Sequence, residues 1–309
     1  MASTSRQGDS NLLSFINSTT PSVLTHNLPK WSFQDWDNLW LPAGRDTVEF
    51  FNLRDLWNQY TEWSAYGAGV EVLLPGGDKV DQFFVPSLSA IQIYTSKSHA
   101  ASRNGLSNCW SNGTAYKKLV NPRRSAADTS SDVEGTRQAQ DKWGYLYFQF
   151  IENASPYGRS PLLEKVQELA NIYPGLMSFK SAELSPASWM SVAWYPIYQI
   201  PRRQNVKDLS ACFLTFHSLT LPYQDHMQRS TVKSLSHTGA WRNGSISEEK
   251  SNRISLHPFG LTTSRARGNL WVNPESGDNE KIASLHEAAN CWLSQLKVHH
   301  DDFNFFVTH

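Results

Sequence analysis

The chain has 309 residues, of which 39% are hydrophobic and 12% aromatic, and its 28 basic side chains are balanced by 28 acidic ones. This neutral balance argues against binding to duplex nucleic acid or an anionic membrane surface, because both attract a basic field. The length allows one large domain or two ordinary ones, and twelve Trp supply ample apolar area for a packed core.

The cysteine pattern and the hydropathy pattern point to an intracellular protein. Cys109, Cys212 and Cys291 are far apart, without the paired spacing of a zinc site or a disulfide framework. The N-terminus has no signal-peptide core, and no window approaches the ~18 apolar residues of a membrane span. We therefore expect a soluble protein of the cytoplasm or nucleus, with no metal and no cofactor.

The N-terminal third predicts one arm, one helix and several strands. Residues 1–30 are rich in Ser, Thr and Asn, with one apolar cluster that predicts a short helix or a docking arm, partly disordered. A short strand is predicted near Val48, then a helix from residue 52 to Gly67, whose apolar residues recur at helical spacing. Strands are predicted at 69–74 and 80–95, and Pro86 either separates two strands or marks a bulge.

Residues 96–142 have no apolar period and are rich in Ser, Asn, Ala and charge. We expect a flexible loop of roughly 45 residues, placed either between two domains or within one sheet. Beyond it, residues 145–152 predict a strand and residues 162–173 a helix, because their apolar residues follow the respective periods.

Two long apolar runs at 189–200 and 209–219 predict the central strands of the core. Pro196 indicates an edge, a bulge or the approach of a ligand, and Tyr195 and Tyr198 fall on opposite faces unless the proline shifts the register. Residues 223–252 predict a second flexible loop, and residues 282–296 a helix. Alternating apolar residues at 303–307 predict a final strand.

These elements interleave without a regular strand–helix–strand rhythm, which favours an α+β fold. We expect a mixed, mainly antiparallel sheet with packed helices, in a single domain over residues 31–309. Two long flexible loops, at about 96–142 and 223–252, are expected to interrupt this domain.

No common catalytic motif is present: the chain has no G-x-S-x-G elbow, no P-loop and no kinase signature. Cys212 and His217 are an odd number of residues apart in one predicted strand, so they point to opposite faces and do not form a nucleophile–base pair. The run at 299–302 contains metal-ligand residue types, but its place between predicted elements favours a structural turn.

The best candidate for a binding site lies around Arg159, which joins a predicted core strand to a predicted helix. A helix N-terminus beside an Arg suits an anion, whereas the alternative is that Arg159 holds a rigid turn, for example against Glu152. The expected partner is a protein, or an acidic or phosphorylated peptide. The candidate binding residues are Tyr66, Tyr157, Arg159, Tyr195, Tyr198 and His217.

Several strings, among them LWNQYTEWSAYGAGV, SPYGRSPLLEKVQELA, SWMSVAWYPIYQIP and DLSACFLTFHSL, resemble a plant family known as domain of unknown function 789. The family's usual Arg is replaced here by Gln199. The resemblance implies a plant intracellular protein and implies no activity. We therefore expect a non-enzymatic binding or regulatory module, with an enzyme of unrecognised active site or a nucleic-acid-associated protein as the alternatives.

Overall fold

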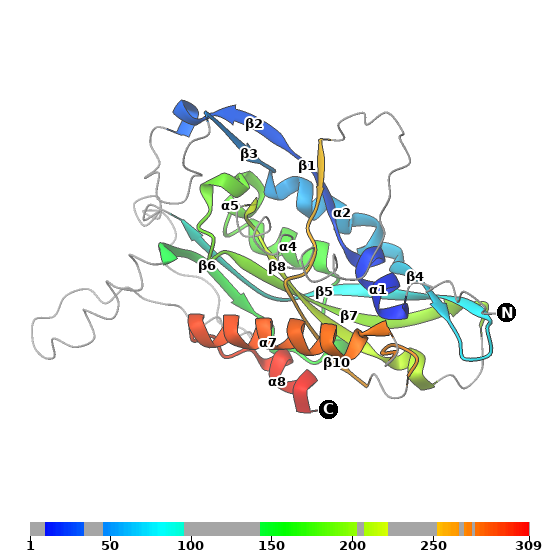
Figure 1. Ribbon diagram of the computed structural model, residues 1–309. Helices are drawn as coiled ribbons and strands as arrows, with labels where there is room; N and C mark the ends of the chain where they lie inside the picture. The colour runs from blue at the N-terminus through cyan, green and yellow to red at the C-terminus, as the bar shows by residue number, and fades with distance from the viewer. Residues whose placement is uncertain are drawn as a thin grey trace, which may run out of the picture.

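The computed structural model describes residues 10–33, 46–95, 143–202, 207–221, 252–265, 269–273 and 276–308 (Figure 1). The flexible loops expected at about 96–142 and 223–252 lie almost wholly outside these ranges. No helix within the ranges is long and apolar enough to cross a membrane.

The described elements mix helices and strands along the chain without a regular rhythm. The helices are α1 (Asn11–Thr19), α2 (Leu53–Tyr66), α4 (Leu162–Ala170), α5 (Gly175–Ser178), α7 (Asp278–Leu296) and α8 (Asp301–Thr308). The strands are β1 (Ser22–Leu24), β2 (His26–Pro29), β3 (Thr47–Phe50), β4 (Ala68–Leu73), β5 (Lys79–Thr95), β6 (Tyr145–Ile151), β7 (Trp189–Ile200), β8 (Cys212–Ser218), β9 (Arg253–Ser255) and β10 (Gly260–Ser264). Short 3-10 helices are η1 (Lys30–Phe33), η4 (Pro156–Gly158), η5 (Ser181–Glu183) and η6 (Lys207–Ser210).

The main sheet has the order β10-β8-β7-β5-β4, and β6 pairs with β5 beside β4. Strand β5 pairs with β7 along one edge, while its other edge pairs first with β4 over 79–84 and then with β6 over 90–95. Two small sheets, β1–β9 and β2–β3, complete the fold. Every pairing among the described strands is antiparallel.

Strands from both sides of the 96–142 segment belong to this one sheet. Thr95 at the end of β5 pairs with Tyr145 at the start of β6, and β5 also pairs with the later strand β7. The alternative of two domains separated by the segment is therefore wrong. The expected single α+β domain, with a mainly antiparallel sheet and packed helices, is confirmed.

The pairing of Thr95 with Tyr145 leads to a prediction about the segment between them. Replacing residues 98–141 with a four-residue turn should leave one cooperative unfolding transition. Since each halving of a loop lowers the closure cost by about 0.6 kcal/mol, we expect the free energy of unfolding to rise by at most ~2 kcal/mol. Thermal unfolding followed by circular dichroism would test this result, and two separate transitions or a loss of folding would contradict it.

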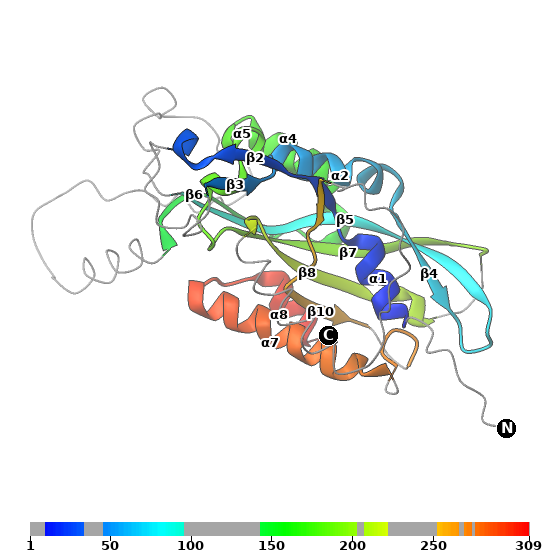
Figure 2. The ribbon, with the colours of Figure 1, turned by 45° about the horizontal axis from the view of Figure 1, so that its top comes forward.

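Helices cover both faces of the main sheet, as Figure 2 shows, with α2, α4 and α5 on one side and α7 and α8 on the other. The larger core lies on the α2 side and includes Phe15 of α1, Trp57 of α2 and Trp194 of β7. The smaller core lies on the α7 side and includes Trp189 of β7 and Trp292 of α7. The alternation along β7 places Trp189 and Trp194 in different cores because adjacent strand residues face opposite sides.

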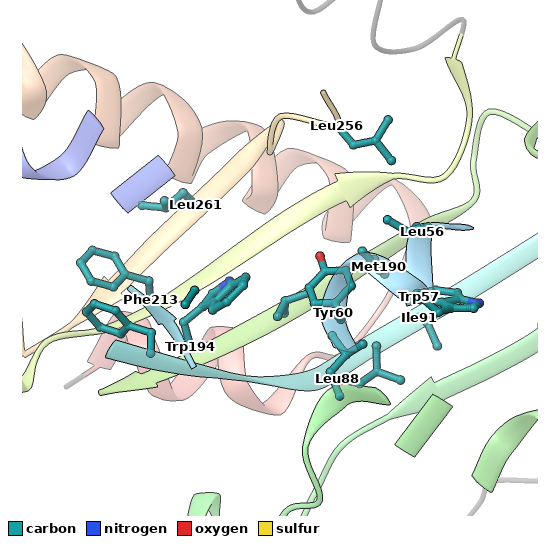
Figure 3. Packing of buried hydrophobic residues seen from close by; sticks show 14 of the residues in the cluster. Leu56, Trp57, Tyr60, Leu88, Ile91, Met190, Trp194, Phe213, Leu256 and Leu261 are labelled. Atoms are coloured by element: carbon teal, nitrogen blue, oxygen red, sulfur yellow. The ribbon is translucent and has the colours of Figure 1, made fainter. Parts of the chain in front are cut away.

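Trp194 lies at the centre of the larger core (Figure 3). Its side chain has no exposed surface, and its Nε1–H donates to Thr215 Oγ1 at 3.0 Å. The rings of Phe15 and Trp63 meet it edge-on, with centroids 6.2 and 5.7 Å away. Edge-to-face aromatic contacts of this kind add to the free energy gained by burial.

Residues 10–29 pack against the rest of the domain instead of forming a separate arm. Leu12 and Phe15 of α1 are fully buried, and β2 pairs with β3 along His26–Pro29. The alternative of a short helix is thus confirmed, whereas the expected boundary between an N-terminal arm and a domain starting at residue 31 cuts through packed structure. Residues 1–9 lie outside the described ranges.

Two prolines affect the β5–β7 ladder in different ways. Pro86 does not separate two strands, because β5 runs unbroken through it for 17 residues. Residues 85–89 pair with none of the described strands on the edge that β4 and β6 share, so the ladder tolerates a residue without an N–H there. At Pro196 the expected bulge is present: Phe84 pairs with Pro196, but Phe83 pairs with Tyr198, which leaves Ile197 unpaired.

The predicted final strand is wrong, since Asp301–Thr308 form helix α8. Phe303 and Phe306, three residues apart, are buried on one face of this helix, whereas Phe305 and Val307 are exposed. The His300 side chain accepts the Phe303 N–H at 3.1 Å and thereby caps the helix. The apolar residues at 303, 305 and 307 alternate as they would in a strand, so their spacing alone does not distinguish helix α8 from a strand.

Candidate functional site

The six candidate residues fall into four separate places. Arg159 and Tyr195 meet beneath α8, and Tyr66 and Tyr198 meet at the end of the sheet. Tyr157 lies in η4 and is completely exposed, whereas His217 lies in the larger core with 1% of its surface exposed. The fold therefore brings together two pairs, not one site of six residues.

Arg159 is held by a buried carboxylate. Its guanidinium forms a two-pronged ion pair with Asp302 of α8, through Nη1 at 2.6 Å and Nη2 at 2.7 Å. Nη1 also donates to the Tyr195 hydroxyl, and Nε and Nη2 donate to the Ala154 carbonyl. All five N–H groups of the guanidinium thus have acceptors within the protein.

The partner of Arg159 is therefore Asp302 and not Glu152. The Glu152 carboxylate instead accepts the backbone N–H groups of Asn153 and Ala154. Burial lowers the pKa of Arg159, but the hydrogen bond and the charge of Asp302 outweigh it and raise the pKa. Burial and the negative charge of Asp302 raise the pKa of Tyr195. The guanidinium thus stays protonated next to a neutral phenol.

Further polar residues join α8 to the sheet around this ion pair. Ser89 of β5 donates to Asp302, and Ser191 of β7 bonds to His300 Nε2 at 2.8 Å. Because His300 Nδ1 accepts the Phe303 N–H, the imidazole proton lies on Nε2, which donates to Ser191. The residues Ser89, Arg159, Ser191, Tyr195, His300 and Asp302 form what we call the α8 polar cluster.

The α8 polar cluster has the donors of an anion site, but an internal anion already occupies them. An external carboxylate or phosphate at Arg159 has to replace Asp302. No local pattern indicates this pairing, because Asp302 is 143 residues from Arg159 and lies in a run interpreted as a turn. Ser89, Ser191 and His300 were missed for the same reason.

A hollow of about 300 Å³ opens beside the cluster, between the end of α7 and α8. Leu293 and Phe303 contribute its apolar part, and Ser294, Lys297 and Asn304 contribute polar groups. His300 borders it, but both of its ring nitrogens are already hydrogen-bonded. No three His, Cys, Asp or Glu side chains gather as a metal site within the described residues.

His217 belongs to a directional hydrogen-bond chain in the larger core. Its Nδ1 donates to the Leu256 carbonyl, so its Nε2 accepts the Thr215 hydroxyl, and Thr215 in turn accepts Trp194 Nε1–H. This chain requires a neutral imidazole, and burial lowers the pKa of His217 to about 4. Cys212 faces the other core, as the odd spacing predicts, and burial raises its pKa to about 11.

Both buried histidines predict acid sensitivity. Burial also lowers the pKa of His300 to about 4. Between a pKa near 6.5 in the unfolded chain and about 4 in the folded chain, the unfolded state binds more protons. The free energy of unfolding should therefore fall as the pH drops from 6.5 to 4, by on the order of 3 kcal/mol per histidine.

Urea unfolding of the wild type and of His300→Gln across this pH range would measure the effect. Glutamine retains an acceptor and a donor but does not titrate, so the variant should lose less stability on acidification than the wild type. Identical pH slopes would contradict a neutral, buried His300.

The second pair of candidate residues forms an exposed surface at the end of the sheet. There β4, β5 and β7 project beyond α7 and α8 (Figure 2). Tyr198 stacks on Phe83 with ring centroids 4.5 Å apart, and its hydroxyl donates to the Tyr66 carbonyl at 3.2 Å. We call Tyr66, Phe83, Ile197, Tyr198 and Ile200 the distal surface.

The bulge at Ile197 creates this surface. Tyr195 pairs with Val85 and Tyr198 pairs with Phe83, so both tyrosines point to the same face of the sheet. The strand register thus shifts after Pro196, which is the condition under which the sequence predicts both tyrosines on one face. Tyr195 reaches α8, whereas Tyr198 lies beyond it and stays 44% exposed.

Gly67 allows the close packing at the base of the distal surface. It ends α2 with a φ of +84°, a conformation that favours glycine. A Cβ at this position would lie 3.0 Å from Ile197 Cδ1 and 3.3 Å from the Phe84 carbonyl oxygen. Any larger residue would push α2 away from β7 and separate Tyr66 from Tyr198.

Comparison with known proteins identifies a family. A family model described as "Protein of unknown function (DUF789)" matches residues 10–306. No curated protein and no solved structure shows a significant match.

Proposed function

Because the chain belongs to the DUF789 family, whose function is unknown, we propose one from its own geometry: a non-enzymatic module that binds a partner protein through the distal surface. We also propose that it acts inside a plant cell. The resemblance of its sequence strings to the plant family supports this location, and a fluorescent fusion imaged in plant tissue would test it.

The observation that carries the proposal is the clustering of exposed apolar side chains. Tyr66 at the end of α2 is 71% exposed, and Ile200, Ile197 and Tyr198 at the end of β7 are 56%, 47% and 44% exposed. Single exposed apolar residues are ordinary, but a group of them typically marks an interaction site. Tyrosines suit such sites, because a rigid ring supplies contact area while the hydroxyl remains hydrogen-bonded.

The buried ionisable residues support a binding module rather than an enzyme. Arg159 and Asp302 neutralise each other, and His217 and His300 each use both ring nitrogens within the protein. A general base needs a free position toward a substrate. These four side chains instead stabilise the attachment of α8 and the larger core.

A charge placed on the distal surface tests the proposal. We expect Ile200→Asp to reduce partner capture at least tenfold, because it removes an apolar contact and brings a charged group that must lose its water into the interface, while the melting temperature stays close to that of the wild type. The measurement is affinity capture from plant extract, quantified by mass spectrometry.

Ile172→Asp is the matched control, because Ile172 is equally apolar and 63% exposed but lies after α4, away from the distal surface. Equal capture by the two variants and the wild type would contradict the proposal. A clear fall in the melting temperature of Ile200→Asp would show that Ile200 supports the fold instead.

A further inference from the structure

Acidic side chains share a face of the sheet with the rings of the distal surface. Asp81 of β5 lies opposite Ile200 of β7 on one side and opposite Glu71 of β4 on the other. Directly opposite residues project from the same face, with Cβ atoms about 4.5–5.5 Å apart. Ile200, Asp81 and Glu71 thus form a row next to the row of Tyr198 and Phe83.

Within the described part of the chain, only one of the two carboxylates of this row forms an ion pair. Glu71 binds Lys79 Nζ at 2.7 Å, and the two side chains are 59% and 61% exposed. Asp81 is exposed and has no ion-pair partner among the described residues, and it faces Glu71 directly. Like charges at opposite positions of antiparallel strands are unfavourable, so a cation from outside would stabilise the row.

We propose that the partner presents a basic, apolar peptide segment to the distal surface. A Lys or Arg of the segment pairs with Asp81, while a neighbouring aromatic or aliphatic side chain packs on Tyr198 and Ile200. The long stem of a basic residue packs on apolar surface with its charge in water, and its cation is attracted to ring faces. This inference rests on the proposed docking function and specifies the partner.

The charges of the row decide between partner classes. Exposed rings on a sheet also suit the stacking of unpaired bases, but Asp81 and Glu71 repel the phosphates that supply most of the affinity for nucleic acid. They repel acidic or phosphorylated peptides for the same reason. Arg159, the cation that the sequence suggests for acidic or phosphorylated peptides, is already paired with Asp302.

The test uses a display library of random twelve-residue peptides, selected on the full chain. We expect the selected peptides to combine Lys or Arg with aromatic or aliphatic residues. Fluorescence anisotropy of the resynthesised peptides should then show that Asp81→Lys weakens their binding about fivefold, which is the upper range for an exposed ion pair. Glu168→Lys, the same change of net charge on exposed α4, should leave binding unchanged.

A second variant separates this inference from the docking function. Ile200→Ser removes the apolar contact without changing the charge of the row, so it should abolish the binding of every selected peptide. If Ile200→Ser abolishes binding but Asp81→Lys does not weaken it, the basic partner is wrong and the docking surface stands. If neither variant changes binding, both proposals are wrong. Selection of acidic peptides, no selection at all, or tighter binding of a single-stranded oligouridine would also overturn the inference.

Discussion

Trp194→Ala should lower the free energy of unfolding by about 5 kcal/mol, at the upper end of the range for a buried aromatic residue. The side chain is fully buried between α1, α2 and the sheet, so its removal leaves a cavity lined by Phe15, Tyr60 and Trp63. It also leaves the Thr215–His217 hydrogen-bond chain without its first donor. Such a loss is a large part of the ~5–15 kcal/mol that stabilises a typical domain.

Urea unfolding of the variant measures this loss, with Trp31→Ala as the control. Trp31 lies in η1 and is 68% exposed, so the same truncation there should change the free energy of unfolding by less than ~0.5 kcal/mol. A Trp194→Ala variant that unfolds at the wild-type urea concentration would show that the larger core does not depend on this ring.

Asp302→Ala should lower the free energy of unfolding by about 3–5 kcal/mol, the usual effect of breaking a buried ion pair. The Arg159 and Asp302 side chains are only 4% and 8% exposed, so the variant leaves a buried cation without its counter-ion. It also deprives Ser89 of its acceptor. We expect α8 to detach first, because Asp302 and His300 are its main polar links to the sheet.

Hydrogen exchange of α8 and urea unfolding of the whole chain would measure the two effects. Replacing both charges, as in Arg159→Met with Asp302→Leu, should cost less than either single change, because no unpaired charge remains. The exposed pair Lys79–Glu71 is the control, and Lys79→Ala should cost less than ~1 kcal/mol. An equally small effect of Asp302→Ala would contradict a buried, structural ion pair.

The sequence by itself determined the elements whose pattern is local. The predicted strand at 189–200 has the bounds of β7, and the predicted helix from residue 52 to Gly67 corresponds to α2. The apolar period and, for α2, the glycine at its end suffice for such elements, because neighbouring residues set the backbone and the buried face. The α+β class also followed from the order of strands and helices.

Only the tertiary structure decided what depends on residues far apart in the chain. Nothing near residue 302 indicates that its carboxylate meets Arg159. Nothing near residues 303–307 indicates whether they form a helix on the face of the sheet or a strand at its edge. The bulge at Ile197 moved Tyr198 onto the face of Tyr195 but beyond the reach of α8. Local propensity is worth a few tenths of a kcal/mol per residue, whereas the loss of a packed ring or of one partner of a buried ion pair costs several, so long-range contacts determined the candidate site.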